Sequence, residues 1–221
     1  MQAVESETLI LYHTDLRGQW PEPAAQALAA RLPYARRLAA RAGGATQRAS
    51  LAGIALALRA LTRILGRRVS AGELVFAQGQ KPRLVQHTGG AAAIGAGAPD
   101  TVGGAEPTAP PDFSISHAGP WVGCAALARG QVGFDVEPDS APRSADWVVR
   151  EALLKATGAG IGAVREVGAL EVDDGCMYWR GERWHVQRLG LFTGACACVV
   201  SSVAVRELRA QGLALAELFD P

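Results

Sequence analysis

The sequence predicts a mixed α+β fold, and three of its features carry that prediction. The second half of the chain consists mainly of short apolar or alternating runs separated by brief turns, which is typical of antiparallel strands. The first half contains one long stretch in which apolar residues recur at helical spacing. A chain of 221 residues is also long enough to bury a sizeable core without disulfides. We therefore expect strands and helices in separate runs, as in α+β proteins.

The first half begins with an expected strand at residues 7–13, followed by a helix at residues 21–42 that Pro33 would break in two. The strongest helix is expected at residues 46–65. Its apolar positions are Leu51, Ile54, Ala55, Leu58, Leu61 and Leu65. A short strand at residues 74–77 then leads to a Gln-Lys-Pro turn.

Residues 87–111 consist mostly of Gly, Ala, Pro and Thr. This composition cannot bury enough surface to order itself well, so we interpret the stretch as a linker or mobile loop. It divides the chain into an N-terminal α+β half at residues 1–86 and a C-terminal α+β half at residues 112–221.

The C-terminal half is expected to contain one helix, at residues 144–157, among many strands. The strands are expected at residues 112–116, 121–128, 132–137, 167–172, 176–180, 183–190 and 194–205. Short turns between several of them favour antiparallel pairing.

The composition argues against several classes of protein. A formal charge of +1 and an apolar fraction of 49% are typical of ordinary globular proteins, so nucleic acid binding has no support. The four cysteines lack zinc-ribbon spacing and are expected to be reduced thiols. No apolar stretch approaches the roughly 20 residues that span a bilayer, and the N-terminus lacks the pattern of a signal peptide. We expect a cytoplasmic monomer that does not bind membranes.

Three segments place carboxylates and cations at informative spacings. Asp135 and Glu137 are two apart in an expected strand and therefore share one face. Glu151 and Lys155 are four apart in an expected helix and lie one turn apart on one side. Hard divalent cations prefer such groups of carboxylates. The simpler interpretations are a solvated strand face for the first pair and a helix-surface ion pair for the second.

These segments, with their neighbours, resemble the Sfp type of 4′-phosphopantetheinyl transferase. The matching motifs are FSISH at residues 113–117, GFDVE at 133–137 and WVVREALLKATGAG at 147–160, in this order. Gly-Pro-Trp after the histidine and Lys81-Pro82 upstream add to the match. The resemblance implies two similar α+β halves related by approximate two-fold symmetry, with the active site between them.

The resemblance also implies an activity. It is the Mg²⁺-dependent transfer of 4′-phosphopantetheine from coenzyme A to a serine of an apo acyl or peptidyl carrier protein, with release of adenosine 3′,5′-bisphosphate. Such enzymes serve fatty-acid, polyketide or nonribosomal peptide biosynthesis, and the motifs do not select among these pathways. Carrier proteins are acidic, so a basic patch near the cleft is expected to steer them.

By the same resemblance, Asp135, Glu137 and Glu151 hold Mg²⁺, while Lys155 clamps a phosphate. Glu151 is either a metal ligand alone or also the base that accepts the proton of the serine, and both alternatives stay open. Asp135 is expected to contribute little to packing, because it lies near the end of a strand. We therefore expect Asp135, Glu151 and Lys155 to be the catalytic residues.

Further coenzyme A contacts are expected from Ser116 and His117, and from Lys81 in its Lys-Pro turn. The remaining candidate cations are Arg36 or Arg37, and Arg48, for which an ordinary surface charge is the simpler interpretation. Trp147 is expected to pack its helix onto the sheet.

Two features depart from the family pattern. Position 150 is arginine where the family has lysine, and these two cations differ in phosphate geometry. The link at residues 138–146 is much shorter than in most members, which puts carrier binding in doubt. An alternative is therefore a catalytically impaired homologue that binds coenzyme A or a partner without transferring anything. A metal-dependent phosphohydrolase is a third hypothesis.

Overall fold

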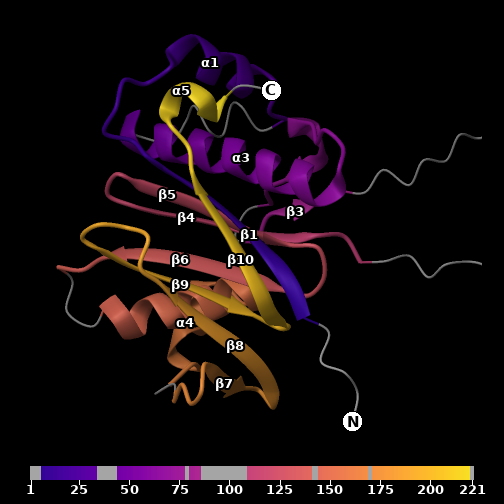
Figure 1. Cartoon of the computed structure of the whole chain (residues 1–221), viewed down its shortest axis with the longest axis vertical. Coiled ribbons are helices and arrows are strands. Elements are labelled where there is room, and N and C mark those ends of the chain that lie inside the picture. Colours follow the sequence, from indigo (N-terminus) through magenta and orange to yellow (C-terminus); the bar gives the residue numbers. More distant parts are fainter. Residues whose placement is uncertain are drawn as a thin grey trace, which may run out of the picture.

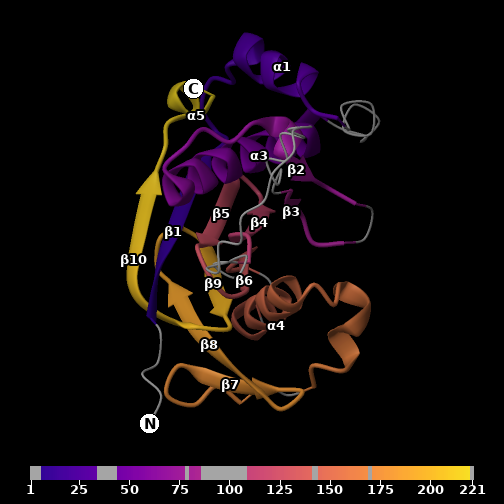
Figure 2. The ribbon, with the colours of Figure 1, turned by 90° about the vertical axis from the view of Figure 1, so that its right-hand side faces the viewer.

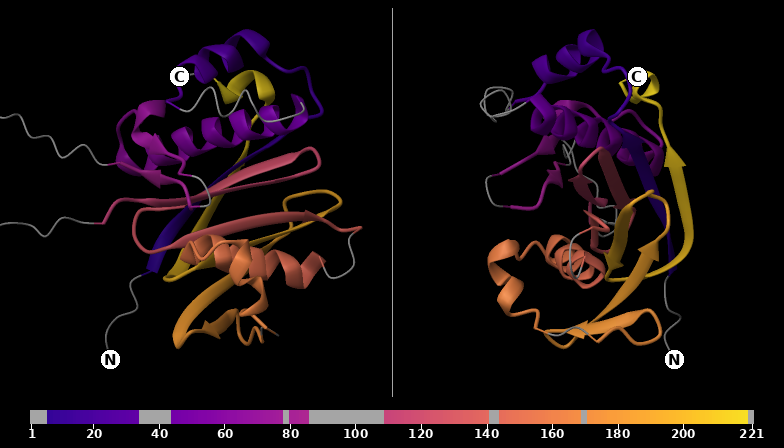
Figure 3. Two further views of the ribbon diagram at one scale, coloured as in Figure 1. Left: turned by 180° about the vertical axis from the view of Figure 1, so that it is seen from behind. Right: turned by 90° about the vertical axis from the view of Figure 1, so that its left-hand side faces the viewer.

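The computed structural model describes residues 6–33, 44–77, 80–85, 109–140, 144–168 and 171–219, and within them the fold is α+β. Two four-stranded sheets pack against each other, and a long helix covers the outer face of each. Figures 1 and 3 show the resulting layers, from α3 through the two sheets to α4. Among the described residues, no helix is long and apolar enough to cross a membrane.

The first sheet has the strand order β10-β1-β5-β4. Its strands are β1 (Ser6–Asp15), β4 (Asp112–Ala118), β5 (Trp121–Leu127) and β10 (Ala204–Gly212). β10 runs parallel to β1, while the other neighbours are antiparallel. Strands from both sides of the 87–111 stretch thus build one sheet. Of the linker or mobile loop expected at 87–111, residues 87–108 lie outside the described residues, and the expected division into halves stays a prediction.

The helix α3 (Gly44–Leu65) packs on this sheet with its apolar face, as its sequence spacing predicts. The helices α1 (Glu22–Ala30) and α5 (Leu215–Leu218) lie above α3 in Figures 1 and 2, on its side away from the sheet. A 3-10 turn, η1 (Ala71–Glu73), and a small hairpin complete this part. The hairpin consists of β2 (Leu74–Val75) and β3 (Arg83–Leu84).

The second sheet has the order β6-β9-β8-β7 and is antiparallel throughout. Its strands are β6 (Val132–Pro138), β7 (Cys176–Trp179), β8 (Glu182–Leu189) and β9 (Ala195–Ser201). The helix α4 (Ser144–Thr157) packs on its outer face and is followed by the 3-10 helix η2 (Ile161–Arg165), as Figure 2 shows.

An apolar layer holds the two sheets together. Leu9 and Leu11 of β1 meet Phe134 of β6 and Val199 of β9 in this layer, and all four side chains are buried. The edge strands β4 and β6 approach each other directly, since Ser114 donates a hydrogen bond to the carbonyl of Phe134 at 3.4 Å. This edge-to-edge approach brings the motif residues of both sheets together.

Some expected elements differ in the structure. The strand expected at 167–172 is not found at its described residues, and residues 169–170 lie outside them: Val167 lies in the turn after η2 and packs into the core beneath α4, while Val172 is exposed. The strand expected at 194–205 is two strands, β9 and β10, because the chain bends at Ser202 and Val203 and crosses to the other sheet. The sequence did not predict the pairing of β10 with β1, because β10 contains several charged residues. Of the helix expected at 21–42, α1 ends before Pro33, and residues 34–43 lie outside the described residues.

Candidate metal and phosphate site

The site begins with a close contact between β6 and α4. A Cβ atom on Gly133 would lie 1.8 Å from the carbonyl oxygen of Ala152, so only glycine lets the helix backbone approach the strand this closely. Because α4 lies directly on β6, Glu151 and Lys155 are held over the strand residues Asp135 and Glu137.

Three carboxylates converge at this contact. One oxygen each from Asp135, Glu137 and Glu151 can be chosen such that all three lie within 4.8 Å of one another. Asp135 is 1% exposed and the other two are partly buried. The buried position of Asp135 corrects the expectation that this residue contributes little to packing: it lies inside the β6–α4 interface rather than at an open strand end.

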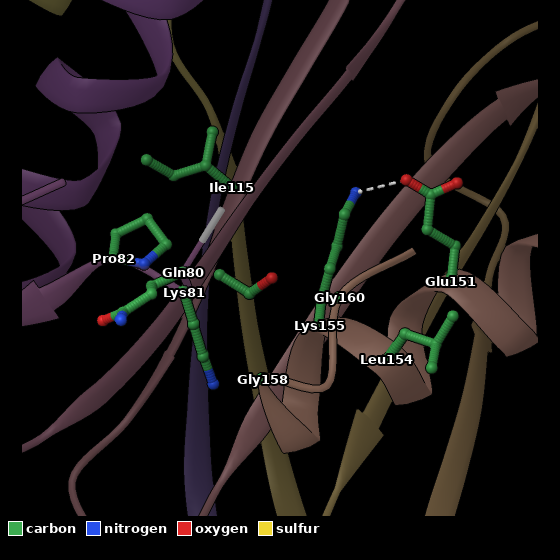
Figure 4. Close-up of a pocket in the computed structure, with 10 residues that line it drawn as sticks. Gln80, Lys81, Pro82, Ile115, Glu151, Leu154, Lys155, Gly158 and Gly160 are labelled. Atoms are coloured by element: carbon green, nitrogen blue, oxygen red, sulfur yellow. Dashed lines mark ion pairs between the residues drawn. The ribbon is translucent and has the colours of Figure 1, made fainter. Parts of the chain in front are cut away.

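Lys155 is the centre of the polar network. Its ammonium group lies 2.6 Å from Asp135 Oδ1 and 3.3 Å from Glu151 Oε1, and the second of these ion pairs is drawn in Figure 4. It also donates a hydrogen bond to Ser116 Oγ at 2.8 Å, and Ser116 Oγ donates to Asp135 Oδ1 at 2.7 Å. Ser116 thus ties the edge strand of the first sheet to the acidic cluster on the second.

Burial raises the pKa values of two carboxyl groups in the cluster. It raises the pKa of Asp135 to about 6, an effect that nearby Glu151 reinforces and that Lys155 and Ser116 oppose. Burial and the charge of Glu151 also raise the pKa of Glu137, against the opposing effects of Lys155 and of the nearby indole N–H of Trp147. Both shifts disfavour the charged forms of these two carboxyl groups, at a place where three carboxylates share one lysine.

The donor set fits a hard divalent cation. Asp135 Oδ2 is buried and has no hydrogen-bond partner among the described residues, so an electron-rich oxygen is left without a counterpart inside the cluster. Three carboxylates with such an oxygen are ligands that Mg²⁺ or Ca²⁺ prefers. Asp135, Glu137 and Glu151 could hold such an ion.

Trp147 has a role that its sequence context did not predict. The expectation that it packs its helix onto the sheet is wrong, because the ring is 36% exposed and its Nε1 donates a hydrogen bond to Glu151 Oε2 at 3.0 Å. Val148 and Val149 provide the buried face of α4 at this point. Residues 147 and 151 are one helical turn apart, and this spacing is the signal that could have identified the contact.

A pocket of about 220 Å³ adjoins the cluster, between α4 and the turn that contains Lys81 (Figure 4). Its wall combines residues of the Lys81 turn, of β4 in the first sheet, of α4 and of the turn after α4: Gln80, Lys81, Pro82, Ser114, Ile115, Glu151, Leu154, Lys155, Gly158 and Gly160. The two glycines have φ angles of +70° and +72°, which favour glycine where the chain turns back beside the pocket. The pocket offers an anionic ligand a place next to Lys155.

Lys81 lines this pocket, but its ammonium group is engaged elsewhere. It forms an ion pair with Asp112 and donates hydrogen bonds to the carbonyls of Val132 at 2.7 Å and Ala156 at 3.3 Å. Burial lowers the pKa of Lys81, and the carboxylate of Asp112 opposes this shift. The structure therefore gives Lys81 partners that join three separate segments.

The other expected coenzyme A contacts are dispersed. His117 is exposed, and strand alternation places it on the opposite face of β4 from the buried Ser116. The guanidinium of Arg48 stacks over the Trp20 ring, 5.6 Å from its centroid. Arg36 and Arg37 lie outside the described residues. The structure thus brings together Asp135, Glu137, Glu151, Lys155 and Ser116.

No protein-family model matches this chain, and no curated protein is significantly similar to it. The geometry of the site and the motifs in the sequence are therefore the features that point to a function. A cluster that can hold a divalent cation, with a lysine and a pocket beside it, is suited to binding a diphosphate between metal and ammonium.

Proposed function

We propose that this protein transfers 4′-phosphopantetheine from coenzyme A to a serine of an apo acyl or peptidyl carrier protein. The observation that carries the proposal is the convergence of Asp135, Glu137 and Glu151 within 4.8 Å, with Lys155 beside them. These four residues come from two of the three motifs that resemble the transferase family, and Ser116 of the third motif bonds to two of them.

In this proposal, Asp135, Glu137 and Glu151 hold Mg²⁺. The ion supplies charge neutralisation at the diphosphate of coenzyme A. The serine Oγ bonds to the phosphorus of the pantetheine phosphate, and the bond from this phosphorus to the bridging oxygen breaks. Adenosine 3′,5′-bisphosphate leaves with the electron pair of that bond. Lys155 stabilises the negative charge that develops on the leaving phosphate.

The proton of the attacking serine needs an acceptor. Glu151 is suited to this task, because it lies at the pocket wall and its carboxylate is oriented by Trp147 on one oxygen and by Lys155 on the other. The proton passes to Glu151 directly or through a water molecule.

We also propose that the two sheet-and-helix units, in place of residues 1–86 and 112–221, are the pseudo-symmetric halves of a transferase of this type, because the first sheet contains strands from both of those ranges. Each unit consists of four strands and one long helix, α3 or α4. The acidic cluster lies where the edge strands of the two units meet, which is consistent with a ligand bound between halves.

The test is the intact mass of several apo carrier proteins after incubation with the protein, coenzyme A and Mg²⁺, with and without a chelator. We expect a gain of one phosphopantetheine that the chelator prevents. Asp135→Asn should slow the transfer at least about 100-fold, the order expected when one charge-stabilising group is lost from an active site. Asp139→Asn is the matched control, since Asp139 contacts Cys196 and lies outside the cluster.

The other hypotheses predict different outcomes. Binding of coenzyme A without any mass gain would favour the impaired binding homologue, which the short link at residues 138–146 supports. Breakdown of coenzyme A without a carrier protein would favour a phosphohydrolase. Equal transfer by Asp135→Asn and the wild type would remove the acidic cluster from the mechanism.

A further inference from the structure

The acidic cluster already contains a cation, the ammonium group of Lys155. An ammonium group has three hydrogen-bond donors, and those of Lys155 are matched by three acceptors: Asp135 Oδ1 at 2.6 Å, Ser116 Oγ at 2.8 Å and Glu151 Oε1 at 3.3 Å. Two of these acceptors belong to the carboxylates that would hold a metal ion. Lys155 thus holds one oxygen of each of these two carboxylates, directly beside the open Asp135 Oδ2 that a divalent cation would use.

An ammonium group and a metal ion cannot both bind Asp135 and Glu151 without strong electrostatic repulsion between them. Mg²⁺ binds oxygen at about 2.1 Å, so an ion on Asp135 and Glu151 would lie next to an ammonium group held by the same two carboxylates. At such a short separation, and with Asp135 buried, repulsion between the two cations is poorly screened. Binding of the metal would therefore push Lys155 away from Asp135.

The side chain of Lys155 has space to move into the neighbouring pocket. Its side chain is 26% exposed and lines the pocket of about 220 Å³ between α4 and the Lys81 turn. Lys81 has no such freedom, because it is fixed to Asp112 and to two backbone carbonyls. Of the two lysines in the sequence, only Lys155 can exchange a carboxylate partner for an anion in the pocket.

We propose that Lys155 is a placeholder cation: it neutralises Asp135 in the metal-free protein, and the divalent cation displaces it into the pocket. The metal thereby makes available the positive charge that receives the diphosphate. This inference rests on the proposed function for the identity of the diphosphate, but the exchange itself depends only on the acidic cluster. It predicts that the metal binds before the diphosphate.

The exchange can be measured in the wild-type protein through the reactivity of its two lysines. We expect Mg²⁺ to increase the rate at which an amine-acylating reagent labels Lys155 by about fivefold or more, followed by peptide mass spectrometry. Lys81 is the internal reference, and its labelling should not change. An unchanged or slower labelling of Lys155 at saturating Mg²⁺, or a failure of the protein to bind Mg²⁺, would overturn the proposal.

A second measurement uses Mn²⁺ as the probe, with free Mn²⁺ followed by electron paramagnetic resonance at pH 8. Lys155→Met should bind Mn²⁺ about tenfold more tightly than the wild type, which corresponds to about 1.4 kcal/mol, because the competing cation is gone. Arg150→Met is the matched control: it removes a positive charge from the same helix, and no ion pair to Arg150 is found among the described residues. Equal or weaker Mn²⁺ binding by a folded Lys155→Met would contradict the exchange.

These experiments distinguish the inference from the proposed function. If Mg²⁺ exposes Lys155 but no carrier protein gains phosphopantetheine, the exchange stands and the transferase proposal fails. If carrier proteins are modified while Mg²⁺ does not change the labelling rate of Lys155, the transferase proposal stands and the exchange proposal fails.

Discussion

The burial and the pKa of Asp135 are decided by the segments that surround it in the folded protein. The motif GFDVE identifies it as a candidate ligand, but the letters do not say that it is 1% exposed or that one of its oxygens lacks a partner among the described residues. A solvated aspartate would be ionised at neutral pH at no cost to stability. A buried aspartate with a raised pKa makes the stability of the whole protein depend on pH.

The pH dependence has a definite sign. The pKa of Asp135 is about 6 in the folded protein, against an ordinary value of 3.8. The stability contributed by protonated Asp135 is therefore fully present below 3.8 and is lost as the pH rises through about 6. We expect the free energy of unfolding to fall between pH 5 and pH 7 by about 1 kcal/mol more in the wild type than in Asp135→Asn.

Urea unfolding at the two pH values measures this difference. Glu73 supplies a contrast within the same chain, since hydrogen bonds from Arg67 lower its pKa to about 2. Its stabilising contribution is lost as the pH falls from 4.5 toward 2, outside the window chosen for Asp135. Identical pH profiles for Asp135→Asn and the wild type would show that Asp135 is not buried in the way described.

At the scale of elements, the sequence identified β6 and α4 but not their contact. Alternation along 132–137 and helical spacing in residues 144–157 are local patterns, and both elements are confirmed. The expected strand at 167–172 failed because short apolar runs also occur in turns that cover a core. Nothing in the local pattern indicated that Gly133 is the point where the helix backbone approaches the strand.

Gly133→Ala tests this contact. Its Cβ atom would lie 1.8 Å from the carbonyl oxygen of Ala152, so α4 must move away from β6. We expect a loss of about 1–3 kcal/mol in the free energy of unfolding, the usual cost of overpacking. Mn²⁺ binding should also weaken, because Glu151 moves with the helix while Asp135 does not.

Gly190→Ala is the control, because its added Cβ atom meets no atom within 4 Å and its φ is not in the left-handed region. We expect this variant to match the wild type in chemical denaturation and in Mn²⁺ titration. Normal Mn²⁺ affinity in Gly133→Ala would mean that the spacing of β6 and α4 does not determine the acidic cluster.

At the scale of the molecule, contacts between distant segments hold the two sheets in place. β1 lies between β5 and β10, so the first sheet is complete only after β10, which is distant in the sequence, has paired with β1. Lys81 makes a second such connection, from the turn before β3 to Asp112 at the start of β4, the start of β6 and the end of α4.

Lys81→Met should therefore destabilise the protein. The change leaves the Asp112 carboxylate without its ion-pair partner and frees two carbonyls, and breaking such a mostly buried pair costs about 3 kcal/mol. We expect a lower midpoint of urea unfolding, and partial recovery in Lys81→Met/Asp112→Asn, where no uncompensated charge remains. A higher KM for coenzyme A with unchanged stability would instead assign Lys81 the phosphate contact that the Lys-Pro motif predicts.

The sequence by itself determined the mixed α+β character, most of the elements and the residues of the candidate site. Helical and strand periodicities depend on residues two to four apart, so they place Asp135 with Glu137 and Glu151 with Lys155 without knowledge of the fold. The tertiary structure decided what those residues meet. The burial of Asp135, the Ser116–Lys155 bridge, the hydrogen bond from Trp147 to Glu151 and the pairing of Lys81 with Asp112 depend on how segments pack in space. Local periodicity carries no information about such packing.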